Sequence, residues 1–330
     1  MKRGVRNMHL NRLGLGKWAS RVIPVLAAVL TSGLLLAVPI WLEASILPEK
    51  DSFPILQSDE GTSPAGQARQ AVPILLYHNL AEDGADEARI TGSTISQAQF
   101  EEEMAILAGN GYETVSFQQM FDFVEKGTPL PERPVCITFD DGYLSNYRIA
   151  FPILKRYRMK ATIFVIGSTV GNTVTYKDTD FPITPHFDDT QAREMTDSGL
   201  ISIQTHTYDM HQWPAYETGT RIRKNILPLP EESDEDYARA LEADLHRARK
   251  EIEEVTGQPV NVLAYPGGTS NQLSQELLVS FGVKATLSIN PGKAVLTQGC
   301  PTSLQNMNRF YVLYTTSQEE FLEWIAEEPA

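Results

Sequence analysis

The sequence predicts an α/β fold built on a parallel sheet. One observation behind this is a buried strand, 135–139, that ends in two adjacent carboxylates and a glycine. The other is that short, apolar, β-favouring runs alternate with helical patterns from Val72 onward, as in parallel α/β proteins. Because functional side chains in such proteins lie at the carboxyl ends of strands, these ends are where we look for a site.

Each predicted strand is a short apolar run bounded by turn residues. The first ends in a histidine, the third in the two aspartates, and the sixth in Tyr-Pro-Gly-Gly. The expected strands are 72–78, 113–117, 135–139, 161–166, 200–204, 260–265 and 284–289.

Serines at the expected N-cap positions and apolar residues at helical spacing predict the helices between these strands. Ser96 and Ser233 precede two of them, and charges recur at helical spacing along the second, which indicates a solvated face. The expected helices are 96–109, 117–126, 146–157, 190–198, 233–256 and 272–281. Residues 81–95 and 167–190 are polar and predict loops.

The N-terminal segment predicts a membrane anchor. Residues 1–21 are basic without an acidic residue, and residues 22–42 form an uncharged, almost wholly apolar run. Its length matches the ~20 residues that cross a bilayer and exceeds the ~7–15 of a signal-peptide core. The basic flank should stay in the cytoplasm and place everything after Leu42 on the extracytoplasmic side. A cleaved signal peptide, which would release a secreted protein, is the alternative.

Two further segments complete the predicted organisation. Residues 43–70 mix Pro, Ser, Gly, Gln and charges without periodicity, which is typical of a linker. Residues 71–330 then form the folded domain. The net charge of −14 argues against nucleic acid as a partner. The two cysteines, Cys136 and Cys300, exclude a disulfide framework but leave a single bridge between them open.

Five of the predicted strand ends carry unusual residues that a barrel would bring to one rim. They are His78, Asp140 with Asp141, His206 with His211, Tyr265-Pro266-Gly267 and Ser288-Ile289-Asn290. Zinc prefers imidazole nitrogen and carboxylate oxygen, so Asp141, His206 and His211 are candidate metal ligands. An ordinary surface turn is the alternative for Asp-Asp-Gly, and a packed core or loop histidine is the alternative for His78.

A metal at this position predicts hydrolysis of a carbonyl substrate. Asp140 would be the general base, and His78 the general acid that protonates a leaving amine. The backbone N–H of Gly267 is a candidate oxyanion donor. Asp209, between the two histidine ligands, would either hold an imidazole or face solvent. We expect His186 and His246 to be solvated rather than to bind a metal.

The motifs Thr138-Phe-Asp-Asp-Gly142, His206-Thr-Tyr-Asp-Met-His211 and Tyr265-Pro-Gly-Gly268 resemble the polysaccharide deacetylase family (carbohydrate esterase family 4, the NodB-homology domain). The resemblance covers about residues 71–320. It implies a distorted (β/α) barrel and metal-dependent removal of acetyl groups from polysaccharides. It also implies that Asp140 is the catalytic base and that Asp141, His206 and His211 bind the metal.

The early histidine makes the chain look like the branch that deacetylates poly-β-1,6-N-acetylglucosamine in biofilm matrices, where such a histidine is the general acid. Three features depart from the family. The family's Arg-x-Pro-Tyr pattern reads Ala264-Tyr-Pro-Gly267 here, so the arginine that steadies the base is missing, and Gly267 replaces a tyrosine. The late Leu-x-His motif is also absent, since Ser288-Ile-Asn290 stands there. A peptidoglycan or chitooligosaccharide deacetylase, an O-acetyl esterase and a catalytically weak glycan-binding homologue therefore stay as alternatives. A structural envelope protein would leave the clustered aspartates and histidines unexplained.

Overall fold

The computed structural model describes residues 67–85, 90, 92–217 and 219–326. The predicted basic flank, the predicted anchor at 22–42 and most of the predicted linker lie outside these residues. Within the described ranges, no helix is both long enough and apolar enough to cross a membrane.

A parallel sheet occupies the centre of the domain, and its strands follow the order β10-β9-β8-β7-β6-β2-β12, with β5 beside the start of β6. The two edges of the sheet approach each other, because a parallel bridge joins Leu287 of β10 to Met307, three residues before β12. The predicted parallel α/β sheet is thus confirmed, and it curls in the manner of a distorted barrel. The bounds are β2 (Ile74–Tyr77), β5 (Glu113–Thr114), β6 (Pro134–Phe139), β7 (Ala161–Val165), β8 (Ile201–Thr205), β9 (Val262–Ala264), β10 (Ala285–Leu287) and β12 (Phe310–Tyr311).

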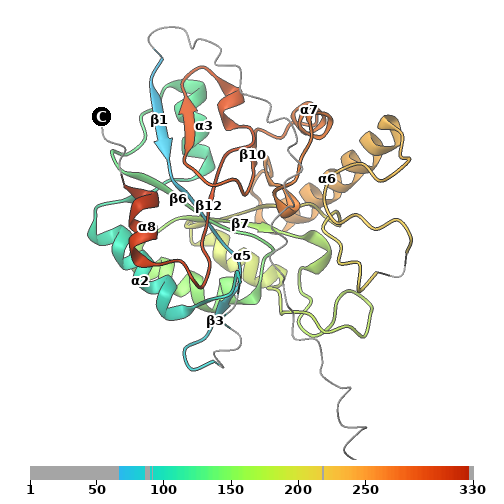
Figure 1. Cartoon of the computed structure of the whole chain (residues 1–330), viewed down its shortest axis with the longest axis horizontal. Helices are drawn as coiled ribbons and strands as arrows, with labels where there is room; N and C mark the ends of the chain where they lie inside the picture. The colour runs from blue at the N-terminus through green and yellow to red at the C-terminus, as the bar shows by residue number, and fades with distance from the viewer. Residues whose placement is uncertain (1–66, 86–89, 91, 218, 327–330) are drawn as a thin grey trace, which may run out of the picture. The chain divides into compact units, whose positions relative to one another are not determined.

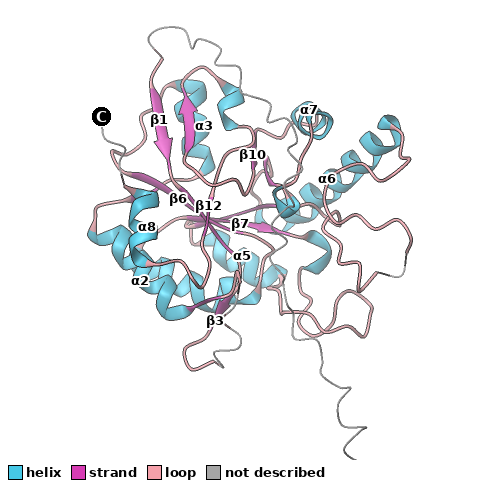
Figure 2. Cartoon of the chain, viewed as in Figure 1, coloured by secondary structure: helices cyan, strands magenta, loops and turns pink. Residues whose placement is uncertain are grey.

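Helices surround the sheet, as Figure 2 shows. All six predicted helices are present, and Ser96 and Ser233 cap two of them by accepting hydrogen bonds from the backbone N–H groups of Gln99 and Asp236. The α-helices are α2 (Gln97–Gly109), α3 (Phe117–Lys126), α4 (Phe151–Tyr157), α5 (Asp189–Asp197), α6 (Asp234–Thr256), α7 (Gln272–Ser280) and α8 (Gln318–Ile325). Shorter turns are η2 (Asn146–Ala150, a π-helix that precedes α4), η3 (Gly167–Thr169), η4 (Pro266–Gly268) and η5 (Pro301–Leu304).

Several short elements were not predicted. Strand β1 (Arg69–Val72) pairs antiparallel with β11 (Ala294–Thr297), which lies next to α3 in Figure 1, and β3 (Leu80–Ala81) pairs with β4 (Ile95–Ser96). Strand β12 and helix α8 were also missed. The strand expected at 113–117 is only β5, because Ser116 already caps helix α3.

The alternation along β6 sets the direction of the candidate site. Val135, Ile137 and Phe139 pack into the hydrophobic cluster formed with the surrounding helices. The intervening Thr138 faces the other way, and its hydroxyl lies 3.4 Å from the guanidinium of the fully buried Arg309. Asp140, two residues further on, continues this inner face. Both cysteines are free, so the disulfide left open by the sequence does not form here.

Candidate metal and catalytic site

The backbone turns sharply at the two adjacent aspartates. Asp141 has φ 70° and Gly142 has φ 81°, both in the left-handed region. Only glycine fits at position 142, since a Cβ there would lie 2.9 Å from Cγ1 of Val165. The turn leaves both carboxylates buried, with exposed fractions of 2% for Asp140 and 6% for Asp141. Both carboxylates lie at the carboxyl end of β6, and their convergence on one metal centre stays a prediction.

The structure brings the three predicted metal ligands together. One potential ligand atom from each of Asp141, His206 and His211 lies within 4.8 Å of the others. The Oδ1 atom of Asp141 is 3.6 Å from Nε2 of His206 and 4.0 Å from Nε2 of His211. Ligand atoms around a tetrahedral zinc ion lie about 3.3 Å apart, so a small contraction would complete the coordination.

The orientation of both imidazoles supports this reading. Nδ1 of His206 donates to the carbonyl oxygen of Ala264 at 2.8 Å, and Nδ1 of His211 donates to that of Lys224 at 3.2 Å. With the proton on Nδ1, each Nε2 presents its lone pair toward Asp141. The buried Oδ1 of Asp141 has no hydrogen-bond partner among the described residues. An unsatisfied carboxylate oxygen facing two imidazole lone pairs fits a divalent cation.

The protonation states of the site also suit a metal. Burial raises the pKa of Asp141, but the charges of His78, His206 and His211 outweigh burial and lower it. Burial lowers the pKa of His206 to about 4. At neutral pH Asp141 is therefore ionised and His206 is neutral, which are the forms that coordinate a cation.

Asp140 is paired with an arginine that the sequence prediction considered missing. Arg309 has no exposed surface, and its Nη1 and Nη2 donate to the two carboxylate oxygens of Asp140 at 2.8 Å each. Nε of Arg309 donates to the carbonyl oxygen of Ser288 at 2.8 Å, which fixes the plane of the guanidinium. The prediction was wrong because the arginine comes from the segment before β12 and not from the motif after β9.

Arg309 also sets the charge of Asp140. Burial alone would raise the pKa of this carboxyl, but the guanidinium charge and its hydrogen bonds, together with His206 and His78, hold it at about 2. A bidentate pair of this kind fixes the position of the carboxylate as well as its ionisation.

His78 follows β2 at the same rim. Its ring stacks on Tyr311 at a centroid distance of 4.9 Å, and its carbonyl oxygen accepts a hydrogen bond from Nδ2 of Asn146 at 2.8 Å. Its charge lowers the pKa of both Asp140 and Asp141. Within the described part of the chain, the buried Nδ1 has no hydrogen-bond partner. His78 is thus next to the aspartates, and its role as general acid stays a prediction.

Gly267 lies in the turn η4 after β9, with φ 60° and an exposed backbone. The next residue, Gly268, approaches Ile289 of the neighbouring strand end so closely that a Cβ would lie 2.3 Å from Cγ1 of Ile289. Two more of the predicted strand ends therefore meet. The function of Gly267 as an oxyanion donor remains a prediction.

Two expectations about polar residues near the site need revision. His186 is 1% exposed, its ring contacts that of Tyr143 at a tilt, and burial lowers its pKa to about 4, so the prediction that it is solvated was wrong. Asp209 holds neither imidazole. It accepts a hydrogen bond from Ser168 at 2.9 Å and pairs with Lys177 at 2.7 Å.

Comparisons with known proteins agree with the geometry. Residues 127–286 match the family model described as polysaccharide deacetylase. The chain is 29% identical over 264 residues to the poly-β-1,6-N-acetyl-D-glucosamine N-deacetylase of Escherichia coli (strain K12), covering 76% of this chain and 38% of that protein.

Two solved structures share the fold. A de-N-acetylase from Aggregatibacter actinomycetemcomitans superposes with a TM-score of 0.65 at 27% identity, covering 77% of this chain and 100% of that one. IcaB from Ammonifex degensii superposes with a TM-score of 0.61 at 26% identity, covering 77% and 97%. Residues 127–286 thus match the polysaccharide deacetylase family, which the motifs of the sequence resemble.

Proposed function

We propose that the protein is a zinc-dependent N-deacetylase of an extracellular polysaccharide similar to poly-N-acetylglucosamine. The named relatives support this substrate class, since the E. coli protein is a poly-β-1,6-N-acetyl-D-glucosamine N-deacetylase. The observation that carries the proposal is the arrangement of two neighbouring carboxylates with different partners. Asp141 faces two imidazoles, whereas Asp140 is held by Arg309.

Asp141, His206 and His211 would hold the cation. When bound, a zinc ion supplies Lewis-acid polarisation of a carbonyl oxygen and lowers the pKa of a water molecule that it coordinates. Because Asp140 makes its hydrogen bonds to Arg309, it is outside this ligand set and stays available as a base.

The protein residues then move two protons. Asp140 accepts a proton from the water that attacks the acetyl carbonyl carbon, and Gly267 N–H stabilises the oxyanion that forms. His78 donates a proton to the amide nitrogen as the carbon–nitrogen bond breaks. The products are acetate and a free amine on the sugar.

Arg309 weighs against the catalytically weak, glycan-binding alternative. That alternative depended on two absences, of an arginine beside the base and of the tyrosine replaced by Gly267. The guanidinium of Arg309 removes the first of these grounds. Peptidoglycan or chitooligosaccharide deacetylation and O-acetyl ester hydrolysis use the same chemistry and remain competing substrates. We also propose that residues 22–42 anchor the protein in the cell membrane, with the domain on the extracytoplasmic side.

The test is acetate release by the full chain. The protein is incubated with β-1,6-linked and β-1,4-linked N-acetylglucosamine oligomers, peptidoglycan fragments and an O-acetylated sugar, with zinc or with a chelator. We expect the fastest zinc-dependent release from the β-1,6 oligomers. Faster release from another substrate would replace the proposed polymer, and zinc binding without any release would favour the glycan-binding alternative.

A further inference from the structure

The loop that joins the two histidine ligands has a conformation that its own sequence does not favour. His206 and His211 are separated by five positions, which places them on different faces of a helix. Thr207, directly after the first ligand, has φ 73° in the left-handed region, which is strained for a β-branched residue. Contacts from outside the loop must therefore hold it in place.

One of these contacts comes from helix α6. Oδ1 of Asp244 accepts the backbone N–H of Tyr208 at 2.8 Å, and Oδ2 accepts that of Asp209 at 2.7 Å. The carboxylate thus uses one oxygen for each of two successive amides in the middle of the loop. An asparagine at position 244 would offer a single oxygen, so only a carboxylate provides both acceptors.

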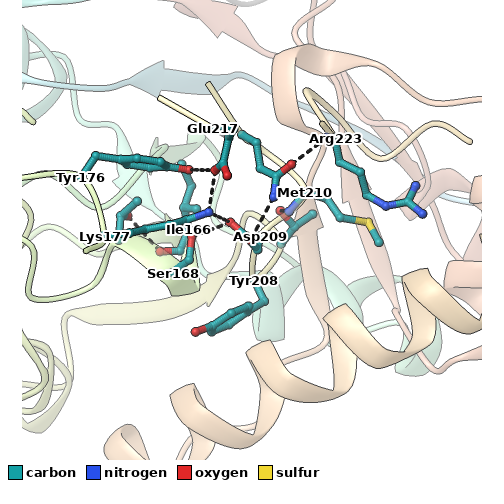
Figure 3. Close-up of polar contacts among 12 residues, drawn as sticks. Ile166, Ser168, Tyr176, Lys177, Tyr208, Asp209, Met210, Glu217 and Arg223 are labelled. Carbon is teal, nitrogen blue, oxygen red and sulfur yellow. Dashed lines mark hydrogen bonds and ion pairs between the residues drawn. The ribbon is translucent and has the colours of Figure 1, made fainter. Parts of the chain in front are cut away.

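The second contact is made by Lys177, which extends from the loop between β7 and α5. Figure 3 shows its Nζ between two carboxylates, 2.7 Å from Oδ1 of Asp209 and 2.6 Å from Oε1 of Glu217. Ser168 donates to the same oxygen of Asp209 at 2.9 Å. Tyr176 donates to Glu217 at 2.6 Å. Asp209 is thus fixed through its side chain as well as its amide.

We propose that Asp244 and Lys177 are positioning residues that preorganise the loop between His206 and His211 for metal binding. Asp244 fixes the main chain and Lys177 fixes the side chain of Asp209, so the two histidines keep their separation before a cation arrives. The inference rests on the proposed function, in which these histidines are ligands.

The physical consequence is a change in metal affinity. If the loop is ordered beforehand, binding does not have to supply the free energy of ordering it. Residues that support metal ligands commonly change metal affinity by about 10–100-fold when they are replaced. The acceptor pair of Asp244 reaches two amides, so its loss should have the larger effect.

The experiment measures zinc affinity of the full chain by competition with a chelator, without substrate. The variants are Asp244→Ala, Asp244→Asn and Lys177→Met. Glu242→Ala is the matched control, because Glu242 is an exposed acidic residue two positions away on the same helix. We expect about a tenfold or greater loss of affinity for Asp244→Ala, smaller losses for Asp244→Asn and Lys177→Met, and none for the control.

Urea unfolding of the metal-free variants separates positioning from stability. Unchanged zinc affinity in the Asp244 and Lys177 variants, with or without a lower free energy of unfolding, would overturn the inference and leave the proposed function intact. A wild-type protein that binds no zinc would instead overturn the proposed function, and the inference with it. Asp244→Asn and Lys177→Met keep the size of the side chain and guard against misfolding of the alanine variant.

Discussion

The carboxyl end of β6 and the loop after β8 supply groups to the same site, but they are held in different ways. At β6, a fully buried strand delivers Asp140 to the buried Arg309, and a left-handed turn places Asp141 beside it. After β8, the loop from His206 to His211 has no regular structure and is held by Asp244 and Lys177.

This difference shows which interactions fix the side-chain positions in each half of the site. The β6 end depends on strand pairing and on one buried ion pair, which are parts of the folded core. The β8 loop depends on polar groups that reach it from α6 and from the loop before α5. Damage to the first half should therefore affect both chemistry and stability, whereas damage to the second should affect mainly metal binding.

The largest expected effect separates the two aspartates of β6. Asp140→Asn removes the base but none of the three ligands, so acetate release should fall by about 10²–10⁴-fold while zinc content is retained. Asp141→Asn should instead lose zinc, because it replaces a charged ligand by a neutral amide. Acetate release and zinc content are measured on the same preparations. Near-native turnover by Asp140→Asn would show that Asp140 is not the base.

The next effect concerns Arg309, a fully buried residue that pairs with the proposed base Asp140. Arg309→Met leaves the carboxylate of Asp140 buried without its cation, which should cost about 3–5 kcal/mol in the free energy of unfolding at neutral pH. Acetate release should fall as well, because the base loses its fixed orientation. Arg309→Lys keeps the charge but not the bidentate geometry, so it should be intermediate in both measurements.

The pH dependence of the free energy of unfolding tests the same ion pair, and the pKa of Asp140 fixes its direction. In the wild type, the pKa of Asp140 is about 2, below its ordinary value of 3.8. The ion pair therefore stabilises the fold fully above about pH 4, and this contribution is lost as pH falls through about 2. In Arg309→Met, burial is opposed only by His206 and His78, so the pKa of Asp140 should rise. The stability difference between the two proteins should shrink toward low pH, and the acidic limb of the rate profile should shift to higher pH. Parallel curves for both proteins would contradict the assigned role of Arg309.

The same comparison explains what the sequence revealed. The strand ends could be predicted because apolar runs such as 135–139 stop at charged or aromatic residues. Parallel pairing of the strands then brings these ends together. The six helices were readable from caps and periodicity. The structure groups Asp141, His206 and His211. The sequence predicted this group because aspartate and histidine are residue types that bind zinc.

The residues that hold the site in place could not be predicted from the sequence, for a physical reason. Arg309, Lys177 and Asp244 act across sequence distances of 169, 32 and 35 residues from their partners Asp140 and Asp209. An isolated arginine, lysine or aspartate is ordinarily a solvated residue, and nothing in its neighbours marks it as buried. Arg309 in particular precedes β12, a two-residue strand too short to show any periodicity.

The smallest effect tests whether metal affinity reports the contacts of the loop or the stability of α6. Ser233 caps this helix by accepting the N–H of Asp236 at 3.1 Å, so Ser233→Ala should lower the free energy of unfolding by about 1 kcal/mol. The cap lies eleven positions, about three helical turns, before Asp244, so the carboxylate keeps both of its amides. Urea unfolding should therefore detect the change while chelator competition should not. If Ser233→Ala weakened zinc binding as much as Asp244→Ala, the loop would depend on the whole helix. The contrast between the end of β6, which the folded core holds, and the loop after β8, which polar contacts hold, would then fail.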